Sequence, residues 1–478
     1  MDLFVGLDIG TSKISAVALD ARGALASCAS RSNDAAVGGL APGRDEQSPK
    51  KILEICLGVL HDLSQKLGVA AASVRAMGLT GQMHGGLLAD ENLQPLTNLV
   101  TWRDRRAEEP AEEGRSFLTE FLDRAALEEL AATGMMPSAG YLGTTLYWFV
   151  RSGSLAPKSH WALTIHDWVA SRMAGALTVA TDPSDAASTG LFDVQTGRWS
   201  AKLIEAAGVC ATLMPRVQEP GTILGRLDER IASAVAIPPA CSIHNALGDN
   251  QASVLASLRS PLEEVLVNIG TGGQTSAVTP RFLRAKGIEV RPFPGAKFLA
   301  VGASLCGGAA FRYLAEHYAV AIRELTGTEI PLENVMTVLS RLAEAAPAGA
   351  AGLIVEPLFL GRRDDPARRG AVCGMSMANN TPAHWARAFI EAMARELADY
   401  YRTMRQNGLS ERTRLVGSGN GVRLNPLTRA VAAAEFGLPL SIPAWREEAA
   451  CGAALSAMVG TGALESFDAA RELVRYET

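Results

Sequence analysis

Residues 3–20, LFVGLDIGTSKISAVALD, decide how the rest of the chain is interpreted. A short apolar run ends at Asp8, Gly10-Thr11-Ser12 turn the chain, and residues 14–19 run back as a second apolar strand. Two such runs around a glycine-containing turn predict a β-hairpin. The turn gathers backbone N–H groups and two hydroxyls, which suits a phosphate, and Asp8 offers the carboxylate oxygen that Mg²⁺ prefers. Taken alone, a plain hairpin is the favoured explanation of these residues.

A second copy of this pattern occurs about half a chain later. Residues 265–278, VLVNIGTGGQTSAV, again place an apolar strand before a turn, Ile269-Gly270-Thr271-Gly272, and an apolar return. An internal repeat is informative about the fold, and 478 residues exceed one ordinary core. The sequence therefore predicts an α/β protein with two related domains that face one nucleotide.

The composition limits the kinds of partner. Hydrophobic residues make up 48% and charged residues 20%, the formal net charge is −5, and no basic tract is present. These values argue against nucleic acid or an anionic membrane surface as the main partner. The seven cysteines include no C-x-x-C pair, which is typical of a reducing compartment. No signal peptide or membrane-length apolar run is present, so we expect a cytoplasmic protein.

Polar residues follow two segments of the N-terminal half where a ligand is expected. A predicted strand at 74–79 runs into Gln82-Met83-His84 between glycines, and open α/β sheets bind ligands at such strand ends. Farther along the chain, a sugar-like molecule could pack on the apolar ring of Trp102. It could also form hydrogen bonds with the charged groups of Asp104 and Arg106. A hydrogen-bonded loop histidine and an exposed charged loop are the alternatives. Residues 181–200 are turn-rich, and we expect an irregular segment there.

Two further corners carry candidate residues. Gly248-Asp249-Asn250-Gln251 lies where a strand runs into a helix, although helix capping alone explains an acid at that place. Gly417-Ser418-Gly419-Asn420-Gly421 follows another strand, and its glycines let a flat base or ribose approach the backbone closely. The sequence contains no Walker A motif and no G-x-G-x-x-G after a strand. The defining motifs of P-loop and Rossmann folds are therefore missing.

Taken together, these motifs resemble the FGGY carbohydrate kinases over nearly the whole chain. The resemblance rests on the two glycine turns at 10–12 and 270–272, the 417–421 turn, the 248–250 corner, the 81–85 segment and the W-x-D-x-R pattern at 102–106. It implies a two-domain actin-like (ribonuclease H-like) ATPase fold with the active site in the interdomain cleft. We expect an N-terminal domain over 1–246 and a C-terminal domain over 247–478.

The resemblance also assigns roles to residues. Asp249 is expected to be the general base of phosphoryl transfer, and Asp8 to lie near Mg²⁺. The expected ATP contacts are Gly10, Thr11, Ser12, Lys13, Gly270, Thr271, Gly272, Gly417, Ser418, Gly419 and Asn420. The expected sugar contacts are Gln82, Met83, His84, Trp102, Asp104, Arg106, Asp249, Asn250 and Gln251. Ser418 and Asn420 depart from the Gly and Ala that the family often has, so the base contacts stay open.

Within the family, Gln82-Met83-His84 resembles the ketose-specific branch that includes xylulokinases. Several segments are most similar to sedoheptulokinases, namely 164–167, 184–192, 248–253 and 291–308. Gln251 beside the expected base offers a further hydrogen bond to a longer polyol, and a site built to pair extra hydroxyls disfavours shorter sugars. We therefore expect ATP-dependent phosphorylation of sedoheptulose at its terminal hydroxyl, with a ketopentose kinase as the alternative. The segment 268–272 is closer to the general family pattern than to the Ser-Thr-Ser form of some sedoheptulokinases.

Two other classes of protein are alternatives to a sugar kinase. An actin-fold ATPase that acts as a chaperone or regulator needs a peptide-binding domain, and only about one short helix remains after Met458. A polyol-binding pseudokinase is disfavoured by Asp249 in its motif position. The sequence leaves the oligomeric state open, a homodimer included.

Overall fold

The computed structural model describes residues 2–111, 114–175, 179–362, 365 and 367–477. The chain forms two compact units, and each unit is assembled from separate segments. Unit 1 comprises Met1–Arg259, Val290–Phe298 and Trp445–Val474, and unit 2 comprises Ser260–Glu289, Leu299–Ala444 and Arg475–Thr478. These units divide the chain differently from the boundary expected at 246, which stays a prediction about the family domains.

Unit 1 is built on a mixed sheet. Its strand order is β13 (Ile223–Arg226), β14 (Ser242–His244), β5 (Val74–Gly81), β1 (Leu3–Ile9), β2 (Lys13–Asp20) and β3 (Leu25–Ser32), and β15 (Leu247–Gly248) also pairs with β5. β1 and β2 are antiparallel with Ile9 opposite Ile14, so the predicted first hairpin is confirmed. β1 and β5 are parallel, which brings their carboxyl ends to one edge.

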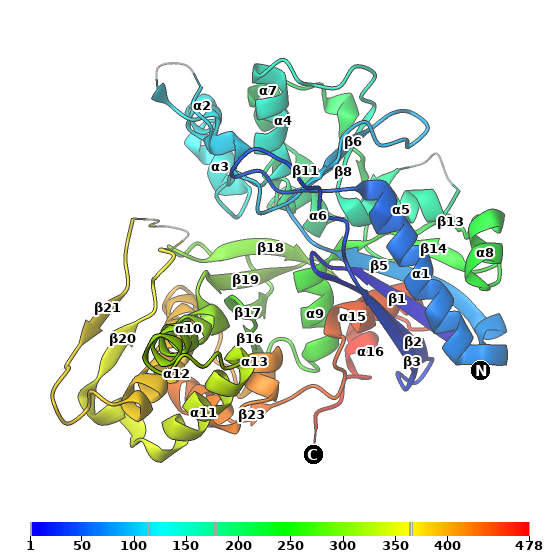
Figure 1. Cartoon of the computed structure of the whole chain (residues 1–478). Coiled ribbons are helices and arrows are strands. Elements are labelled where there is room, and N and C mark those ends of the chain that lie inside the picture. The colour runs from blue at the N-terminus through cyan, green and yellow to red at the C-terminus, as the bar shows by residue number, and fades with distance from the viewer. Residues whose placement is uncertain (1, 112–113, 176–178, 363–364, 366, 478) are drawn as a thin grey trace. The chain divides into compact units, whose positions relative to one another are not determined.

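Two helices cover opposite faces of this sheet (Figure 1). Helix α1 (Pro49–Leu67) begins after the N-cap Ser48 and buries an apolar stripe in the same cluster as Val5 and Leu7 of β1. Helix α15 (Glu448–Gly460), from the C-terminal end of the chain, contacts the alternate face of β1 and β5. There Gly6 and Gly78 lie side by side, and a Cβ on either would overlap α15 backbone.

A second hydrophobic cluster of unit 1 supports the loops that follow these strands. It joins β6 (Leu87–Ala89) to helices α2 (Phe117–Arg124), α4 (Leu142–Arg151) and α7 (Ala201–Ala206). The expectation of an irregular segment over 181–200 is wrong, because residues 183–188 form helix α6 (Pro183–Ser188). Asp182 caps α6 by accepting from the N–H of Asp185, and Pro183 occupies the first helical position, where its missing N–H costs nothing.

Unit 2 repeats the strand arrangement of unit 1. Its sheet contains β19 (Lys297–Ser304), β17 (Gly273–Thr279), β16 (Glu264–Ile269), β22 (Arg414–Ser418) and β23 (Leu440–Ser441) in that order. β16 and β17 form an antiparallel hairpin, which confirms the second predicted hairpin, and β22 and β23 run parallel to β16. The order β19–β17–β16–β22–β23 thus matches β3–β2–β1–β5–β14. Helices α10 (Gly307–Thr326), α11 (Leu332–Ala345), α12 (Pro382–Gln406) and α14 (Pro426–Phe436) belong to this unit.

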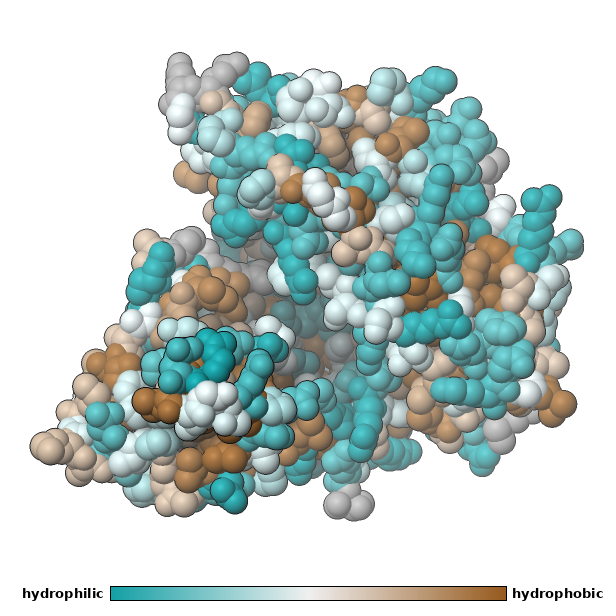
Figure 2. All heavy atoms as spheres, in the orientation of Figure 1, coloured by the Kyte–Doolittle hydropathy of each residue, from teal (hydrophilic) through white to brown (hydrophobic). Residues whose placement is uncertain are grey.

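One face of the molecule is seen in the space-filling view (Figure 2). Figure 2 shows hydrophilic side chains over most of the visible face, with smaller apolar patches among them. Within the residues that the structure describes, every helix is too short or too polar to cross a membrane.

Candidate active site

Three strands of unit 1 end at the edge where most of the predicted residues lie. Gln82 follows β5, and its N–H donates to the carbonyl of Ile9 at the end of β1 over 3.0 Å. Gly248 of β15 pairs with Gly81 of β5, so helix α9 (Asp249–Ser257) begins beside the same edge. The fold therefore brings the first glycine turn, the Gln82 segment and Asp249 together at carboxyl strand ends, where α/β sheets bind ligands.

The side chain of Asp8 is suited to bind a metal ion. Its Oδ1 is buried and has no hydrogen-bond partner among the residues that the structure describes. Burial raises the pKa of Asp8 to about 8, and the negative charges of Asp249 and Glu447 add to this effect while Lys13 opposes it. A divalent cation would neutralise a buried carboxylate oxygen that faces other acids, and oxygen is the ligand that Mg²⁺ prefers. The residues present therefore fit a magnesium ion.

The first glycine turn is tied to the predicted sugar loop by hydrogen bonds. Trp102 donates its indole N–H to the Thr11 hydroxyl over 3.1 Å, and that hydroxyl donates to Gln82 Oε1 over 3.1 Å. Gln47 closes the network, because its amide donates to the Thr11 carbonyl and accepts from Gln82, each over 2.8 Å. Sequence reasoning missed Gln47, for which no local pattern gives a signal.

His84 has an unusual backbone. Its φ is 75°, a conformation that costs a non-glycine residue of order 1–3 kcal/mol and is concentrated at functional sites. Ser188 holds both parts of the residue: its hydroxyl accepts from the His84 N–H over 3.2 Å, and its carbonyl lies 3.0 Å from Nδ1. The ring stacks on Tyr141 with centroids 4.2 Å apart. Since a carbonyl only accepts, Nδ1 carries the proton that it donates to Ser188.

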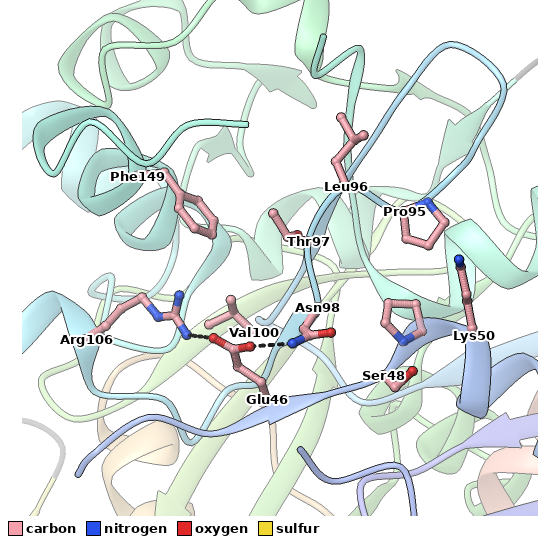
Figure 3. Close-up of a pocket in the computed structure, with 11 residues that line it drawn as sticks. Glu46, Ser48, Lys50, Pro95, Leu96, Thr97, Asn98, Val100, Arg106 and Phe149 are labelled. Atoms are coloured by element: carbon pink, nitrogen blue, oxygen red, sulfur yellow. Dashed lines mark hydrogen bonds and ion pairs between the residues drawn. The ribbon is translucent and has the colours of Figure 1, made fainter. Parts of the chain in front are cut away.

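Asp104 and Arg106 are buried and direct their charges at protein groups. Arg106 donates through Nε to Asp104 Oδ1 over 2.9 Å and through Nη2 to Glu46 Oε1 over 2.5 Å. Figure 3 shows Arg106, Glu46 and Asn98 connected in this way along one wall of a pocket of about 510 Å³. Asp104 also accepts from the backbone N–H of Asp45 over 2.8 Å. These contacts brace the loop that carries Trp102, and direct sugar contacts of Asp104 and Arg106 stay a prediction.

Asp249 is the first residue of α9 and is partly exposed. Burial raises its pKa above the ordinary value, whereas the nearby His166 and Arg291 charges oppose this rise. Arg291 also donates to Asn250 Oδ1 over 3.2 Å, which fixes the residue after Asp249. A carboxylate with a raised pKa is a stronger base than an ordinary one and is suited to accept a proton. The predicted strand-to-helix corner is thus present.

Gln251 lies two residues beyond Asp249 and is fully buried. Its amide nitrogen donates to the carbonyl of Pro292 over 3.1 Å. Its Oε1 has no hydrogen-bond partner within the described part of the chain. An unpaired buried acceptor is costly and calls for an explanation, such as a donor that arrives with a ligand.

Behind the edge lies a group of buried acids that sequence reasoning did not assign to the site. His166 of α5 (Ile165–Met173) places Nε2 2.7 Å from Oδ2 of Asp185, and both side chains are fully buried. Burial lowers the pKa of His166 and raises the pKa of Asp185. Burial also raises the pKa of Asp167 to about 6.

The two glycine turns of unit 2 are neighbours, because β16 and β22 are adjacent parallel strands. The Asn268 amide donates to the Ser418 hydroxyl over 2.9 Å. Gly419 has a φ of 78°, and a Cβ there would lie 2.6 Å from the carbonyl oxygen of Ile269. The 270–272 turn also rests on α10, since the Gly308 N–H donates to the Gly270 carbonyl over 2.9 Å. The predicted second phosphate turn and adenosine turn therefore share one edge.

Known proteins resemble the chain over its whole length. It is 27% identical to a glycerol kinase of Polaromonas naphthalenivorans, over 100% of this chain and 94% of the relative. It is also 27% identical to the sedoheptulokinase of Homo sapiens, over 94% of this chain and 96% of the relative. A solved xylulose kinase from Rhodospirillum rubrum superposes with a TM-score of 0.87 at 22% identity, over 100% of this chain and 93% of that one.

Family models match both halves of the chain. The model of the N-terminal domain of the FGGY family of carbohydrate kinases matches residues 3–256, and that of the C-terminal domain matches residues 265–461. The predicted two-domain actin-like fold is confirmed by these matches and by the solved kinases. The chain therefore belongs to the FGGY family of carbohydrate kinases and is itself an ATP-using sugar kinase.

Proposed function

We propose that this kinase phosphorylates the terminal hydroxyl of a ketose, and that sedoheptulose is its substrate, giving sedoheptulose 7-phosphate. The observation that carries the proposal is the edge of unit 1 where Asp249, the first glycine turn and Gln82-Met83-His84 meet. A base, a phosphate turn and polyol-binding groups are what phosphoryl transfer to an alcohol requires.

In this proposal Asp249 takes the proton of the attacking hydroxyl. The sugar oxygen forms a bond to the γ-phosphorus while the bond from that phosphorus to the bridging oxygen breaks, and ADP leaves with the electron pair. The N–H groups of the turns at 10–12 and 270–272 bind phosphate oxygens, and Gly417, Ser418, Gly419 and Asn420 contact the nucleoside. A magnesium ion held by Asp8, when bound, neutralises phosphate charge.

Three residues are proposed to hold the sugar. His84 contacts a sugar hydroxyl with its ring, whose Nδ1 is held by the Ser188 carbonyl. Met83 is buried, and its sulfur would lie 2.7 Å from a Cβ on Gly248, so it packs against the corner that carries Asp249. The exposed part of Trp102 supplies an apolar face for the carbon chain.

The choice of sedoheptulose rests on Gln251. Its orphaned Oε1 gains a partner if a hydroxyl of a longer ketose reaches it directly or through a water. The likeness to human sedoheptulokinase supports this choice, and the equal likeness to a glycerol kinase makes a substrate comparison necessary. We also propose a cytoplasmic location, which fits the seven free cysteines.

The test is an ADP-release assay over sedoheptulose, D-xylulose, D-ribulose and glycerol, with Mg²⁺ and with excess chelator. We expect the kcat/KM for sedoheptulose to exceed the others by about tenfold or more, and the activity to require the metal. A preference of about tenfold for xylulose would contradict the sedoheptulose assignment and leave the kinase intact.

A further inference from the structure

Helix α6 makes side-chain contacts with both parts of the proposed site. It is six residues long, and Ser184 and Ser188 lie one helical turn apart along it. Ser184 contacts the corner before Asp249, and Ser188 contacts His84. Nothing in the reaction itself uses these serines.

Ser184 fixes the residue that precedes the base. Its hydroxyl accepts from the N–H of Gly248 over 2.9 Å and donates to Asp182 Oδ1 over 2.7 Å. Asp182 is the N-cap of α6, so the direction of the Ser184 proton is set by the cap and its lone pair faces Gly248. The residues of this hydrogen-bond series, Asp182, Ser184 and Gly248, are all buried. A buried series of hydrogen bonds makes a site rigid when every donor and acceptor in it has a partner.

Ser188 fixes the predicted sugar contact in the same manner. Its hydroxyl donates to the carbonyl of Asp185 over 2.8 Å and accepts from the N–H of His84 over 3.2 Å. The Ser188 carbonyl receives the Nδ1 proton of His84. One residue thereby holds the backbone of His84 at its positive φ and selects the tautomer of its ring.

A third contact joins α6 to helix α5. Asp185, between the two serines, lies against His166 of α5 with 2.7 Å between Oδ2 and Nε2. A short helix has little stability of its own, so its position depends on such tertiary contacts.

We infer that α6 is the positioning element of this kinase: Ser184 places the corner of Asp249, Ser188 places His84, and one rigid turn sets the spacing between base and sugar. This inference rests on the proposed function of those two residues. About four residues at 1.5 Å each separate the two contacts, a spacing of about 6 Å along the helix axis. A misplacement of about 1 Å at the reacting groups costs up to about 10²-fold in rate.

The test compares Ser184→Ala and Ser188→Ala with Ser171→Ala in the full-length protein. Ser171 is equally buried, but among the residues that the structure describes its hydroxyl bonds only to the Asp167 carbonyl of its own helix. We expect Ser184→Ala to lower kcat about tenfold or more with the sugar KM within about twofold. Ser188→Ala should raise the sugar KM about fivefold or more with kcat within about threefold. Ser171→Ala should change neither parameter.

Partial unfolding cannot produce this split, because loss of active protein lowers kcat in both variants and leaves KM unchanged. The stoichiometry of ATP binding by calorimetry gives the active fraction of each variant. If both variants match Ser171→Ala after this correction, the inference is wrong. Asp249→Asn, measured in parallel, tests the proposed function separately from the inference about α6. If Asp249→Asn keeps its turnover, the proposed function is contradicted. If Asp249→Asn is inactive while Ser184→Ala and Ser188→Ala behave like the unmodified protein, only the inference about α6 is contradicted.

Discussion

The indole N–H of Trp102 donates to the hydroxyl of Thr11 over 3.1 Å. This bond joins the loop predicted to hold the sugar to the turn predicted to hold a phosphate. The Thr11 hydroxyl donates onward to Gln82, so one side-chain network spans both functions. Since the network is partly buried, the loss of one member is expected to weaken the positions of the others.

Replacing Trp102 by Phe keeps an apolar ring and removes the donor. A net hydrogen bond contributes about 1 kcal/mol, so we expect the sugar KM to rise about fivefold. The matched control is Trp199→Phe, whose indole donates to the Pro215 carbonyl at another part of unit 1. Equal KM values for the two variants would contradict a role of Trp102 in the site.

The packing of α15 on the sheet of unit 1 depends on two glycines. A Cβ on Gly78 would overlap the carbonyl of Ala453, and backbone atoms cannot move aside cheaply. We expect Gly78→Ala to lower the free energy of unfolding by about 3 kcal/mol or more, measured by urea denaturation. Gly38 has open space around it and an ordinary φ, so Gly38→Ala should change stability by less than about 0.5 kcal/mol. Similar values for both variants would show that α15 packs differently.

Local patterns predicted the parts of the fold whose contacts are close in sequence. The hairpins at β1–β2 and β16–β17 follow from apolar runs on both sides of glycine turns. The corner at Asp249 was also predicted, because a strand-to-helix junction has a local signature.

Long-range contacts were not predictable in this way. The segment around Ser184 is rich in turn-forming residues and still forms α6, because tertiary contacts with Gly248, His84 and His166 hold it. The positive φ of His84 likewise depends on Ser188, 104 residues away. The membership of α15 in unit 1 depends on packing against Gly6 and Gly78, which no pattern near residue 450 indicates.

The buried Asp167 predicts a pH-dependent stability. Burial raises its pKa to about 6 in the folded protein, above the unfolded value near 3.8, so the folded state binds more protons between these values. The free energy of unfolding therefore falls by about 3 kcal/mol in total as the pH rises from about 4 to about 6. Above about pH 6 the contribution of Asp167 no longer changes with pH. Asp167→Asn removes the ionisation.

We accordingly expect the stability of Asp167→Asn relative to the unmodified protein to rise from pH 4 to pH 6 and then level off. Urea denaturation of both proteins at pH 4, 5, 6, 7 and 8 measures this difference. A difference that does not depend on pH would mean that Asp167 ionises normally in the folded state.

In unit 2 the 270–272 turn depends on the start of α10. A Cβ on Gly308 would press on the carbonyl of Gly270, so Gly308→Ala should displace the turn. We expect the KM for ATP to rise about tenfold, with sugar binding unchanged. Gly327 caps the other end of α10 in open space, so Gly327→Ala serves as the control for strain in the same helix. An equal effect of both variants on the KM for ATP would contradict the phosphate role of this turn.

The Asp249→Asn variant, with calorimetric ATP binding and turnover, tests most directly whether Asp249 is the base of this sugar kinase. The substitution keeps the size of the side chain and removes the proton acceptor. A positioned base contributes about 10²–10⁴-fold, so we predict a loss of kcat in that range with ATP binding almost intact. A fall in turnover of less than about tenfold would mean that Asp249 is only an acidic residue in the first turn of α9, and would contradict the assignment.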